Sequence, residues 1–276
     1  MVAIPDPTRW PLEAIWQAVE PNLPGFTCEV LPAIDSTNSE LMRRFKTGQT
    51  EPTLLVAEQQ TAGRGRLGRQ WHSQRACSLT FSLGLMLAPG DWSGLSLAVG
   101  SSLADSLDAA NAQQHRITLK WPNDLYLVQR NSERKLAGVL VETATFEGQR
   151  FVVIGVGINV RAHQHTFAQT TEFAAQGGAA VLPGCLQDLQ PDADVASTLL
   201  CVLAPLVQTV QAFAQSGFAP FHSRFAQRDA LFGRDVVLSD GTYGQAQGVT
   251  QTGALLVHTA HGMKEIITHE VSVRPC

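Results

Sequence analysis

The sequence predicts an α+β fold in two parts, a larger part over residues 1–229 and a small β part over 230–276. Apolar residues recur every four positions from Leu95 to Leu107, which is typical of one buried helix face. Runs rich in valine, leucine and isoleucine between residues 125 and 160 are separated by polar turns, which indicates an antiparallel meander. From Asp235 onward, short β runs alternate with glycine-containing turns, as expected for a small barrel.

Helix and strand signals alternate through the first half of the chain. One short helix is predicted over Leu12–Val19. Thr37 and Glu40 have the spacing of a capping box, so a second helix is expected to begin at Thr37. Strands are predicted over residues 53–58, 78–86 and 116–121, the last ended by Pro122. The helix of residues 95–107 precedes this last strand, with Asp105 and Asp108 outside its apolar face.

The second half of the chain begins with the meander. Residues 161–193 are rich in alanine, glutamine and glycine without periodicity, which predicts a long mobile loop. Apolar positions from Val195 to Phe213 predict a buried helix, which Pro205 is expected to kink or divide. The other predicted elements are meander strands over 125–129, 135–142 and 150–160 with turns at 130–134 and 146–149, a short helix near 220–228, and β runs over 235–238, 243–249, 254–259, 263–267 and 270–273.

Composition and charge indicate a globular protein without a broad nucleic-acid-binding face. The 276 residues are 44% hydrophobic, and 20 Lys+Arg against 24 Asp+Glu give a net charge of −4. A protein that grips nucleic acid over a wide surface is usually basic. The five cysteines form no C-x-x-C pair, which argues against a zinc site or a disulfide framework. Because the sequence shows neither a signal peptide nor an apolar run approaching the ~20 residues of a membrane span, we expect a cytoplasmic, soluble protein.

The segment Thr61–Arg69 carries the strongest functional signal. Three glycines alternate with three arginines from Gly63 to Arg69. Glycine lets the backbone approach a ligand, and the arginine fork suits phosphates and carboxylates, so the segment predicts an anion clamp, most simply for a nucleotide. Its formal G-x-G-x-x-G pattern is a weak sign of dinucleotide binding, because no strand leads directly into it and no acid follows about 20 positions on. A basic, solvated turn is the plain alternative.

A second polar signal is Lys120-Trp121-Pro122-Asn123-Asp124. A strand delivers the lysine, and an amide and a carboxylate follow on the bend. Asn123 could contact a base, sugar or phosphate, and Asp124 could hold Mg²⁺ or orient an amine. An ordinary strand end with an Asn-Asp turn is the alternative.

Three further segments combine polar residues or glycines with apolar strands. Lys135 and Glu142 bracket a strand whose Ala137 and Gly138 leave room for a ligand, although an edge lysine needs no ligand. The glycines of Gly155-Val156-Gly157-Ile158-Asn159 suggest a close approach or a bulge. In Asp35-Ser36-Thr37-Asn38, a helix cap accounts for Thr37 alone. His163 and His165 lack nearby partners for a metal site, so none is predicted there.

Together these segments resemble the signature of the biotin–protein ligases. Its D-S-T-N, G-R-G-R-x-G-R, K-W-P-N-D, K-L-A-G-(I/V)-L-V-E and G-x-G-I-N motifs occur in order from Asp35 to Asn159. The resemblance implies a mixed central β-sheet with flanking helices, similar to class II aminoacyl-tRNA synthetases, and an SH3-like C-terminal barrel. It covers nearly the whole chain after residue 30.

The resemblance also implies a two-step reaction that uses biotin, ATP and Mg²⁺. Biotinyl-5′-AMP forms first, and a lysine of the biotin carboxyl carrier protein of acetyl-CoA carboxylase then takes the biotin. The arginine loop is expected to close over the ligand. The implied biotin contacts are Ser36, Thr37, Asn38, Gln60, Gly63, Arg64, Gly65, Arg66, Lys135 and Gly138; the implied ATP or adenylate contacts are Arg66, Arg69, Trp71, Asn123 and Asn159; the implied catalytic residues are Arg66, Lys120, Asp124 and Lys135.

Two departures from the family and several alternatives accompany this hypothesis. Only 34 residues precede Asp35, so we expect no N-terminal DNA-binding domain and no DNA partner. The turn at 130–134 looks longer than in some relatives, and the 150–160 strand could pair across a homodimer. A lipoate–protein ligase shares the adenylation logic but lacks the G-R-G-R-x-G-R loop. A non-enzymatic, biotin-responsive or nucleic-acid-binding regulator and an NADH-dependent dehydrogenase are alternatives of other classes.

Overall fold

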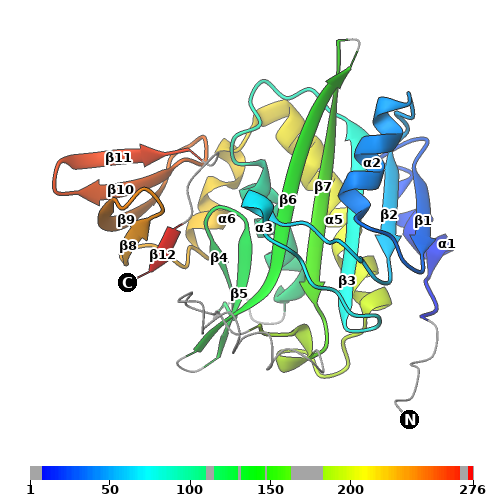
Figure 1. The fold of residues 1–276 in the computed structure, drawn as a ribbon, viewed down its shortest axis with the longest axis horizontal. Coiled ribbons are helices and arrows are strands. Elements are labelled where there is room, and N and C mark those ends of the chain that lie inside the picture. Colours follow the sequence, from blue (N-terminus) through cyan, green and yellow to red (C-terminus); the bar gives the residue numbers. More distant parts are fainter. Residues whose placement is uncertain are drawn as a thin grey trace.

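A seven-stranded mixed sheet forms the centre of the molecule (Figure 1). The structure, a computed structural model, describes residues 8–109, 115–129, 132–146, 148–162, 183–267 and 273–275. The strand order is β1-β2-β3-β7-β6-β5-β4; β1 and β2 pair in parallel and all other neighbours pair antiparallel. The strands are β1 Thr27–Leu31, β2 Thr53–Ala57, β3 Ser78–Met86, β4 Ile117–Lys120, β5 Asp124–Gln129, β6 Ser132–Phe146 and β7 Gln149–Asn159.

The predicted meander is confirmed, with one correction at its first turn. β5, β6 and β7 are consecutive antiparallel neighbours. The predicted turn at 130–134 is mostly strand, because β6 already begins at Ser132, opposite Gln129. β7 is hydrogen-bonded to β3 on one side and to β6 on the other, so the hypothesis that this strand pairs with a second copy is wrong.

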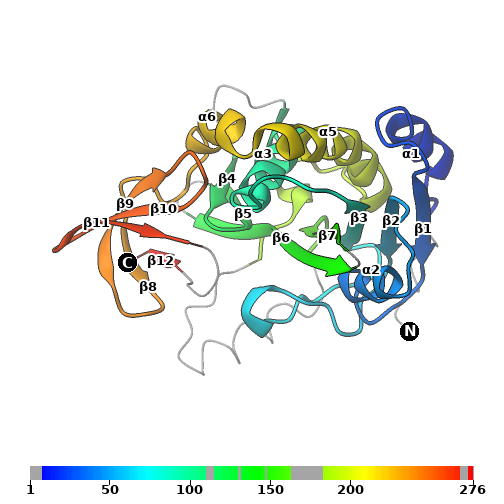
Figure 2. The same ribbon diagram turned by 90° about the horizontal axis from the view of Figure 1, so that it is seen from above.

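The helices cover the two faces of the sheet unequally (Figure 2). α1 (Leu12–Val19), α3 (Leu95–Leu107), α5 (Val195–Ser216) and α6 (His222–Ala226) lie on one face, over the main hydrophobic core. α2 (Thr37–Lys46) lies on the other face, over a small cluster that contains Phe45 stacked on Phe151 at 4.3 Å. Beside α2, this second face is crossed by the segment that joins β2 to β3.

Helix α5 differs from its prediction in continuity and length. It runs unbroken across Pro205 for 22 residues, so proline does not divide it. Buried residues such as Leu199, Leu203 and Leu206 line the helix, which packs against α3, and this packing compensates for the hydrogen bond that proline removes. By length and a mean hydropathy of 1.6, α5 could also cross a membrane, which the sequence had not indicated. However, 56% of its most apolar stretch is buried inside the protein.

Asp108 at the end of α3 is buried, although the sequence pattern had placed it outside the apolar face. Its carboxylate accepts hydrogen bonds from the backbone N–H groups of Arg116 and Ile117 and from the Arg228 guanidinium at 3.0 Å. Only 4% of the Arg228 side chain is exposed, and it also pairs with Asp105. This network fixes the start of β4, the strand that carries Lys120.

The C-terminal part is a separate five-stranded antiparallel sheet, with strands in the order β11-β10-β9-β8-β12. Backbone hydrogen bonds from Leu119 N–H to the Arg228 carbonyl and from Ala230 N–H to the Leu119 carbonyl attach its linker to β4. The buried Trp121 indole donates to the Gly253 carbonyl at 3.1 Å. The strands are β8 Asp235–Leu238, β9 Tyr243–Val249, β10 Leu255–Thr259, β11 Gly262–Ile266 and β12 Val273–Pro275.

The remaining predictions are met in part. Strand β1 was not predicted, because its five residues are mostly half-buried and show no alternating pattern. The predicted helix near 220–228 is a 3₁₀ turn at Ala219–Phe221 followed by α6. Within the predicted loop at 161–193, a 3₁₀ turn forms at Leu186–Asp188. Residues 163–182, with His163 and His165, and residues 270–272 lie outside the described residues.

Candidate functional site

The Arg/Gly loop, residues 61–71, is a folded hairpin on the sheet face that carries α2. The Trp71 N–H donates to the Gly63 carbonyl at 2.9 Å, and the Gly65 N–H donates to the Arg69 carbonyl at 2.7 Å. A Cβ on Gly63 would overlap the Trp71 carbonyl oxygen, so glycine is required there. Leu67 lies at the tip with φ +56°, a left-handed conformation that costs a leucine free energy, and its side chain is exposed.

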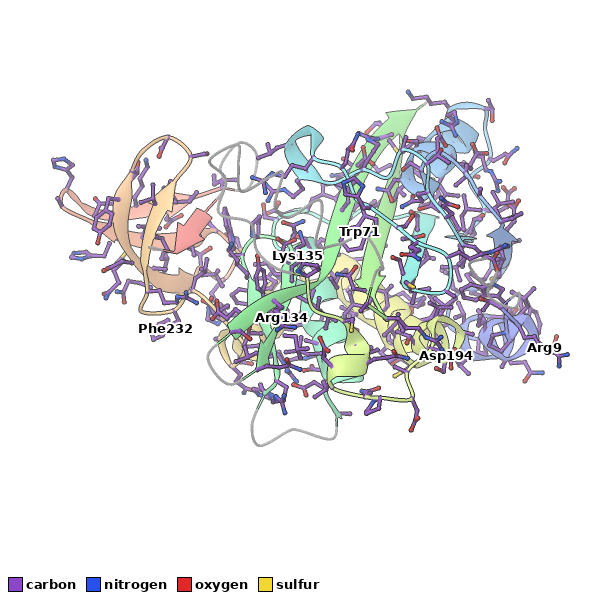
Figure 3. All side chains as sticks on the ribbon, turned by 60° about the horizontal axis from the view of Figure 1, so that its bottom comes forward. Arg9, Trp71, Arg134, Lys135, Asp194 and Phe232 are labelled. Atoms are coloured by element: carbon purple, nitrogen blue, oxygen red, sulfur yellow. The ribbon has the colours of Figure 1, made fainter. Side chains whose placement is uncertain are left out.

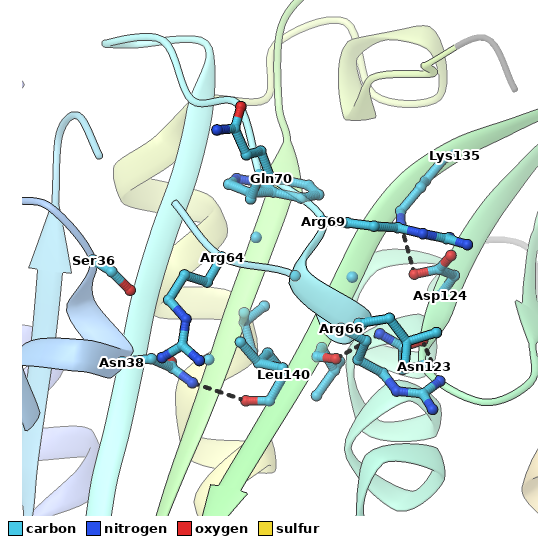
Figure 4. A pocket seen from close by; sticks show the side chains of 18 of the residues that line it. Ser36, Asn38, Arg64, Arg66, Arg69, Gln70, Asn123, Asp124, Lys135 and Leu140 are labelled. Carbon is cyan, nitrogen blue, oxygen red and sulfur yellow. Dashed lines mark hydrogen bonds and ion pairs between the residues drawn. The ribbon is translucent and has the colours of Figure 1, made fainter. Parts of the chain in front are cut away.

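A cavity of about 160 Å³ lies between this loop and the sheet (Figure 4). It brings together all five sequence segments, whose outermost lining residues, Ser36 and Gly157, are 121 positions apart in the chain. Trp71 and Lys135, for example, come from separate segments and both line it (Figure 3). The predicted site residues that line the cavity are Ser36, Thr37, Asn38, Gln60, Arg64, Gly65, Arg66, Arg69, Trp71, Lys120, Asn123, Asp124, Lys135 and Gly138.

Two predicted site residues do not line this cavity. Gly63 lies on the other side of the loop, in a second hollow of about 540 Å³. Asn159 is buried, and its amide donates to the Lys135 carbonyl at 3.2 Å, where it supports the strand that carries Lys135. The loop lies between the two hollows, since Arg64–Leu67, Arg69 and Gln70 line both. The inner cavity is smaller than the roughly 300 Å³ or more of typical ligand sites.

The wall of the cavity includes Phe81 and Leu140, which sequence reasoning missed, and Gly155 and Gly157, for which it had left open a close approach or a bulge. A Cβ on Gly157 would overlap the Trp71 ring, and a Cβ on Gly155 would overlap the Asn38 amide. The ladders to β3 and β6 run without a register shift at these glycines, so the alternative of a bulge is wrong. The two glycines admit side chains of the protein itself, and the signal for this was the presence of glycines in an otherwise apolar strand.

One end of the cavity offers uncharged hydrogen-bonding groups. Ser36, Thr37 and Asn38 are each at most 3% exposed. Thr37 donates to the Gln60 side-chain oxygen from its backbone N–H and from its hydroxyl, at 2.8 and 3.2 Å. The helix begins at Thr37 as predicted, but its N-cap is Ser36, whose hydroxyl accepts from the Ser39 N–H. The capping box predicted between Thr37 and Glu40 is therefore wrong. Glu40 pairs with Arg43 and Arg44 instead.

The other end is cationic. Lys135 pairs with Asp124 at 2.7 Å, and the Arg66 guanidinium donates to the Asn123 side chain at 3.4 Å. Burial lowers the pKa of Arg66, with a further small decrease from the Arg69 charge, and the nearby Asp124 carboxylate opposes both. The guanidinium stays protonated because the pKa of an unperturbed arginine lies far above neutral pH.

Lys120 shares this end with Lys135. Burial is the main cause that lowers the Lys120 pKa; Asp124 opposes the shift and Lys135 adds to it. The ammonium lies 5.3 Å from the centre of the Tyr126 ring. Burial likewise raises the pKa of Tyr126, with Asp124 contributing, so this phenol stays neutral. Partly buried cations in excess of carboxylates favour an anionic ligand at this end.

The geometry suits a ligand with a polar, uncharged head, an apolar body and an anionic tail. Trp71 lines the cavity with its ring against Gly157, and its indole N–H is buried with no acceptor among the described residues. A buried donor of this kind is normally satisfied when the site is complete. Among the described residues no group of three or more His, Cys, Asp or Glu could hold a metal ion by itself.

Comparison with known proteins places this chain in a family. Residues 30–159 match the Biotin/lipoate A/B protein ligase family. The chain is 34% identical over 261 residues to the bifunctional ligase/repressor BirA of Escherichia coli, with coverage of 91% of this chain and 75% of that protein. It is 30% identical to the biotin–acetyl-CoA-carboxylase ligase of Paracoccus denitrificans, with coverage of 88% and 98%.

A solved structure agrees in fold over most of the chain. The biotin protein ligase from Aquifex aeolicus in complex with biotin and ATP superposes with a TM-score of 0.72 and 30% sequence identity, with coverage of 91% of this chain and 99% of that one. The predicted mixed sheet with flanking helices is thereby confirmed. On these similarities, the chain belongs to the biotin protein ligase family.

Proposed function

We propose that this protein is an ATP-dependent biotin–protein ligase that forms biotinyl-5′-AMP and transfers biotin to a lysine of the biotin carboxyl carrier protein. The observation that carries the proposal is the two-ended cavity, which joins an uncharged hydrogen-bonding end to a cationic end beneath an arginine loop. Relatives over nearly the full chain support it, since they bear ligase names and one was solved with biotin and ATP.

The uncharged end suits the ureido ring of biotin, which carries two N–H donors and one carbonyl acceptor. Buried hydroxyls and amides can satisfy each of these groups, and an unsatisfied one would cost about 1–3 kcal/mol. The apolar wall then follows the valeryl chain toward the cations. The proposed biotin contacts are Ser36, Thr37, Asn38, Gln60, Gly63, Arg64, Gly65, Arg66, Lys135 and Gly138.

The cationic end suits the triphosphate and the reacting carboxylate. The adenine ring is proposed to stack on Trp71, with Arg66, Arg69, Asn123 and Asn159 as nucleotide contacts. Asn159 requires a rearrangement, because its amide now faces the Lys135 carbonyl. A single carboxylate, Asp124, fits Mg²⁺, which usually binds through one or two carboxylates together with substrate phosphates. Bound there, the ion would neutralise phosphate charge.

The chemistry joins two anions and then passes the product to an amine. A biotin carboxylate oxygen attacks the α-phosphorus, the bond to the β-phosphate oxygen breaks, and pyrophosphate leaves. Arg66 and Lys135, whose charges are held in place before the reaction, offset the charge that builds up on the phosphorus. The carrier lysine nitrogen then attacks the acyl carbon, AMP leaves, and the amine proton passes to a base. Lys120 and Asp124 lie where they can hold the phosphates or orient that lysine.

Three finer assignments accompany this proposal. Residues 1–229 form the catalytic unit and 230–276 an SH3-like barrel, which the five short antiparallel strands support. The protein works in the cytoplasm, which the four cysteines among the described residues, all unpaired, support. Neither DNA nor a membrane is a proposed partner, and a homodimer would have to form without edge pairing by β7.

The test is a transfer assay. Purified protein is mixed with biotin, MgATP and a biotin-carrier domain, and the carrier is probed with streptavidin. We expect labelling that depends on ATP and is lost when the carrier lysine is replaced by arginine. Lipoate in place of biotin serves as the control for the lipoate ligase alternative. A competent carrier left unlabelled would disprove the proposal.

A further inference from the structure

Glu142 on β6 links the Arg/Gly loop to the buried end of the cavity. Its Oε1 accepts from Arg64 Nη2 at 3.0 Å, and its Oε2 lies 3.4 Å from Arg64 Nη1. The same Oε2 accepts from the Asn38 side-chain amide at 2.9 Å. One carboxylate therefore holds the loop on one side and the first turn of α2 on the other.

The Asn38 side of this link is rigid. Asn38 is 3% exposed, and its amide also donates to the Leu140 carbonyl at 3.2 Å. Its oxygen accepts from the Ser82 hydroxyl at 2.6 Å, and Ser82 lies 2.7 Å from the Thr37 hydroxyl. The amide fits against β7 because Gly155 has no side chain. Asn38 thus orients Glu142 from within the protein.

The Arg64 side of the link is more exposed and makes fewer contacts. Half of the Arg64 side chain is exposed, against 22% of Glu142, and besides Glu142 the guanidinium contacts the Ser39 hydroxyl at 3.3 Å. An ion pair with one buried and one exposed partner contributes little free energy. It can therefore break and re-form when the loop moves. The ion pair also lies beside Asn38 at the uncharged end of the cavity, away from Lys135 and Arg66.

We propose that Glu142 is a positioning residue that holds the Arg/Gly loop closed over the biotin-binding end of the cavity through Arg64. This inference deepens the proposed function and rests on it. The consequence is selective: weakening the ion pair should shorten the time for which biotin and its adenylate stay bound, while the nucleotide contacts at the far end are left in place.

Glu142→Gln removes the charge and keeps an oxygen for Asn38. The matched control is Glu29→Gln, which breaks an equivalent glutamate–arginine pair on β1, away from the cavity. The first measurement is trypsin cleavage after Arg66 and Arg69 in the ligand-free protein, where we expect Glu142→Gln to be cleaved roughly three- to fivefold faster and the control to match wild type. This arm needs no ligase activity, so its result is independent of the proposed function.

The second measurement is enzymatic. Glu142→Gln should raise KM for biotin and speed the release of biotinyl-5′-AMP by a similar factor of roughly three to five, with KM for ATP near the wild-type value. Because Glu142 acts through Arg64, adding Glu142→Gln to Arg64→Gln should change neither cleavage nor release further. Equal cleavage rates in wild type and Glu142→Gln would overturn the inference. So would a double variant in which Glu142→Gln still speeds cleavage or release as much as it does in the presence of Arg64.

Discussion

Gly157 shows how one missing side chain sets the position of a functional ring. The Trp71 indole occupies the space of its Cβ, and overpacking of this kind usually costs about 1–3 kcal/mol. Gly157→Ala should displace Trp71 and raise KM for ATP by roughly tenfold, with KM for biotin changed far less. Gly90→Ala is the control, since nothing lies within 4 Å of its added Cβ. Steady-state kinetics with each substrate varied would test this, and an unchanged KM for ATP would contradict the stacking role of Trp71.

At the residue scale, the motifs predicted most of the cavity but not how its members are held. Arginines, glycines and the Lys-Trp-Pro-Asn-Asp turn carry their chemistry locally, so spacing alone identifies them. Ser82 and Gly155 are opposite each other in the ladder although 73 positions separate them in the sequence. Their contacts with Asn38 arise only when β3, β7 and α2 come together, and no local pattern reports that pairing.

An ion pair between Asp35 and Arg43 lies at the start of helix α2. Hydrogen bonds from Arg43, and secondarily from the Ser36 N–H, lower the Asp35 pKa to about 2 from 3.8. The carboxylate is favoured in the folded state, so its stabilisation is present above pH 3.8 and is lost as the pH falls through about 2. Since both partners are about half exposed, the contribution should stay below about 1 kcal/mol.

Urea unfolding between pH 7 and pH 2 would test this expectation. Asp35→Asn should be slightly less stable than wild type at pH 7, and the difference should vanish toward pH 2. Asp192→Asn, at an exposed position, should track wild type throughout. A difference that persists at pH 2 would show that the effect is not ionic.

At the element scale, prediction succeeded where a segment carries its own signal. β2, β3, α3 and the meander have long apolar runs, and their bounds agree within a few residues. β1 failed because an edge strand of half-buried residues has no pattern of its own and is held by its parallel neighbour β2. The predicted break in α5 was wrong for the opposite reason. The local signal, Pro205, is clear, but packing on α3 outweighs its cost.

At the scale of the whole molecule, Trp121 joins the two sheets beside the Asn123–Asp124 bend. Trp121→Phe removes the buried hydrogen bond to Gly253 and leaves its carbonyl unsatisfied, which should lower the free energy of unfolding by about 2 kcal/mol. Trp16→Phe, at a position 44% exposed, should cost far less. Urea titrations of both variants would decide this, and equal stabilities would show that the indole hydrogen bond does not hold the sheets together.

The unequal covering of the main sheet has a practical consequence. Helices α1, α3, α5 and α6 occupy one face, whereas α2 and the arginine loop lie on the other, so the two faces can be addressed independently. Cys201 is exposed on α5, while Cys28, Cys77 and Cys185 are shielded to differing degrees. With Cys276 replaced by serine, a maleimide-coated support would capture the protein by its helical side and leave the loop facing the bulk solution. Partial burial raises the pKa of the Cys201 thiol, so mildly alkaline buffer would speed the coupling.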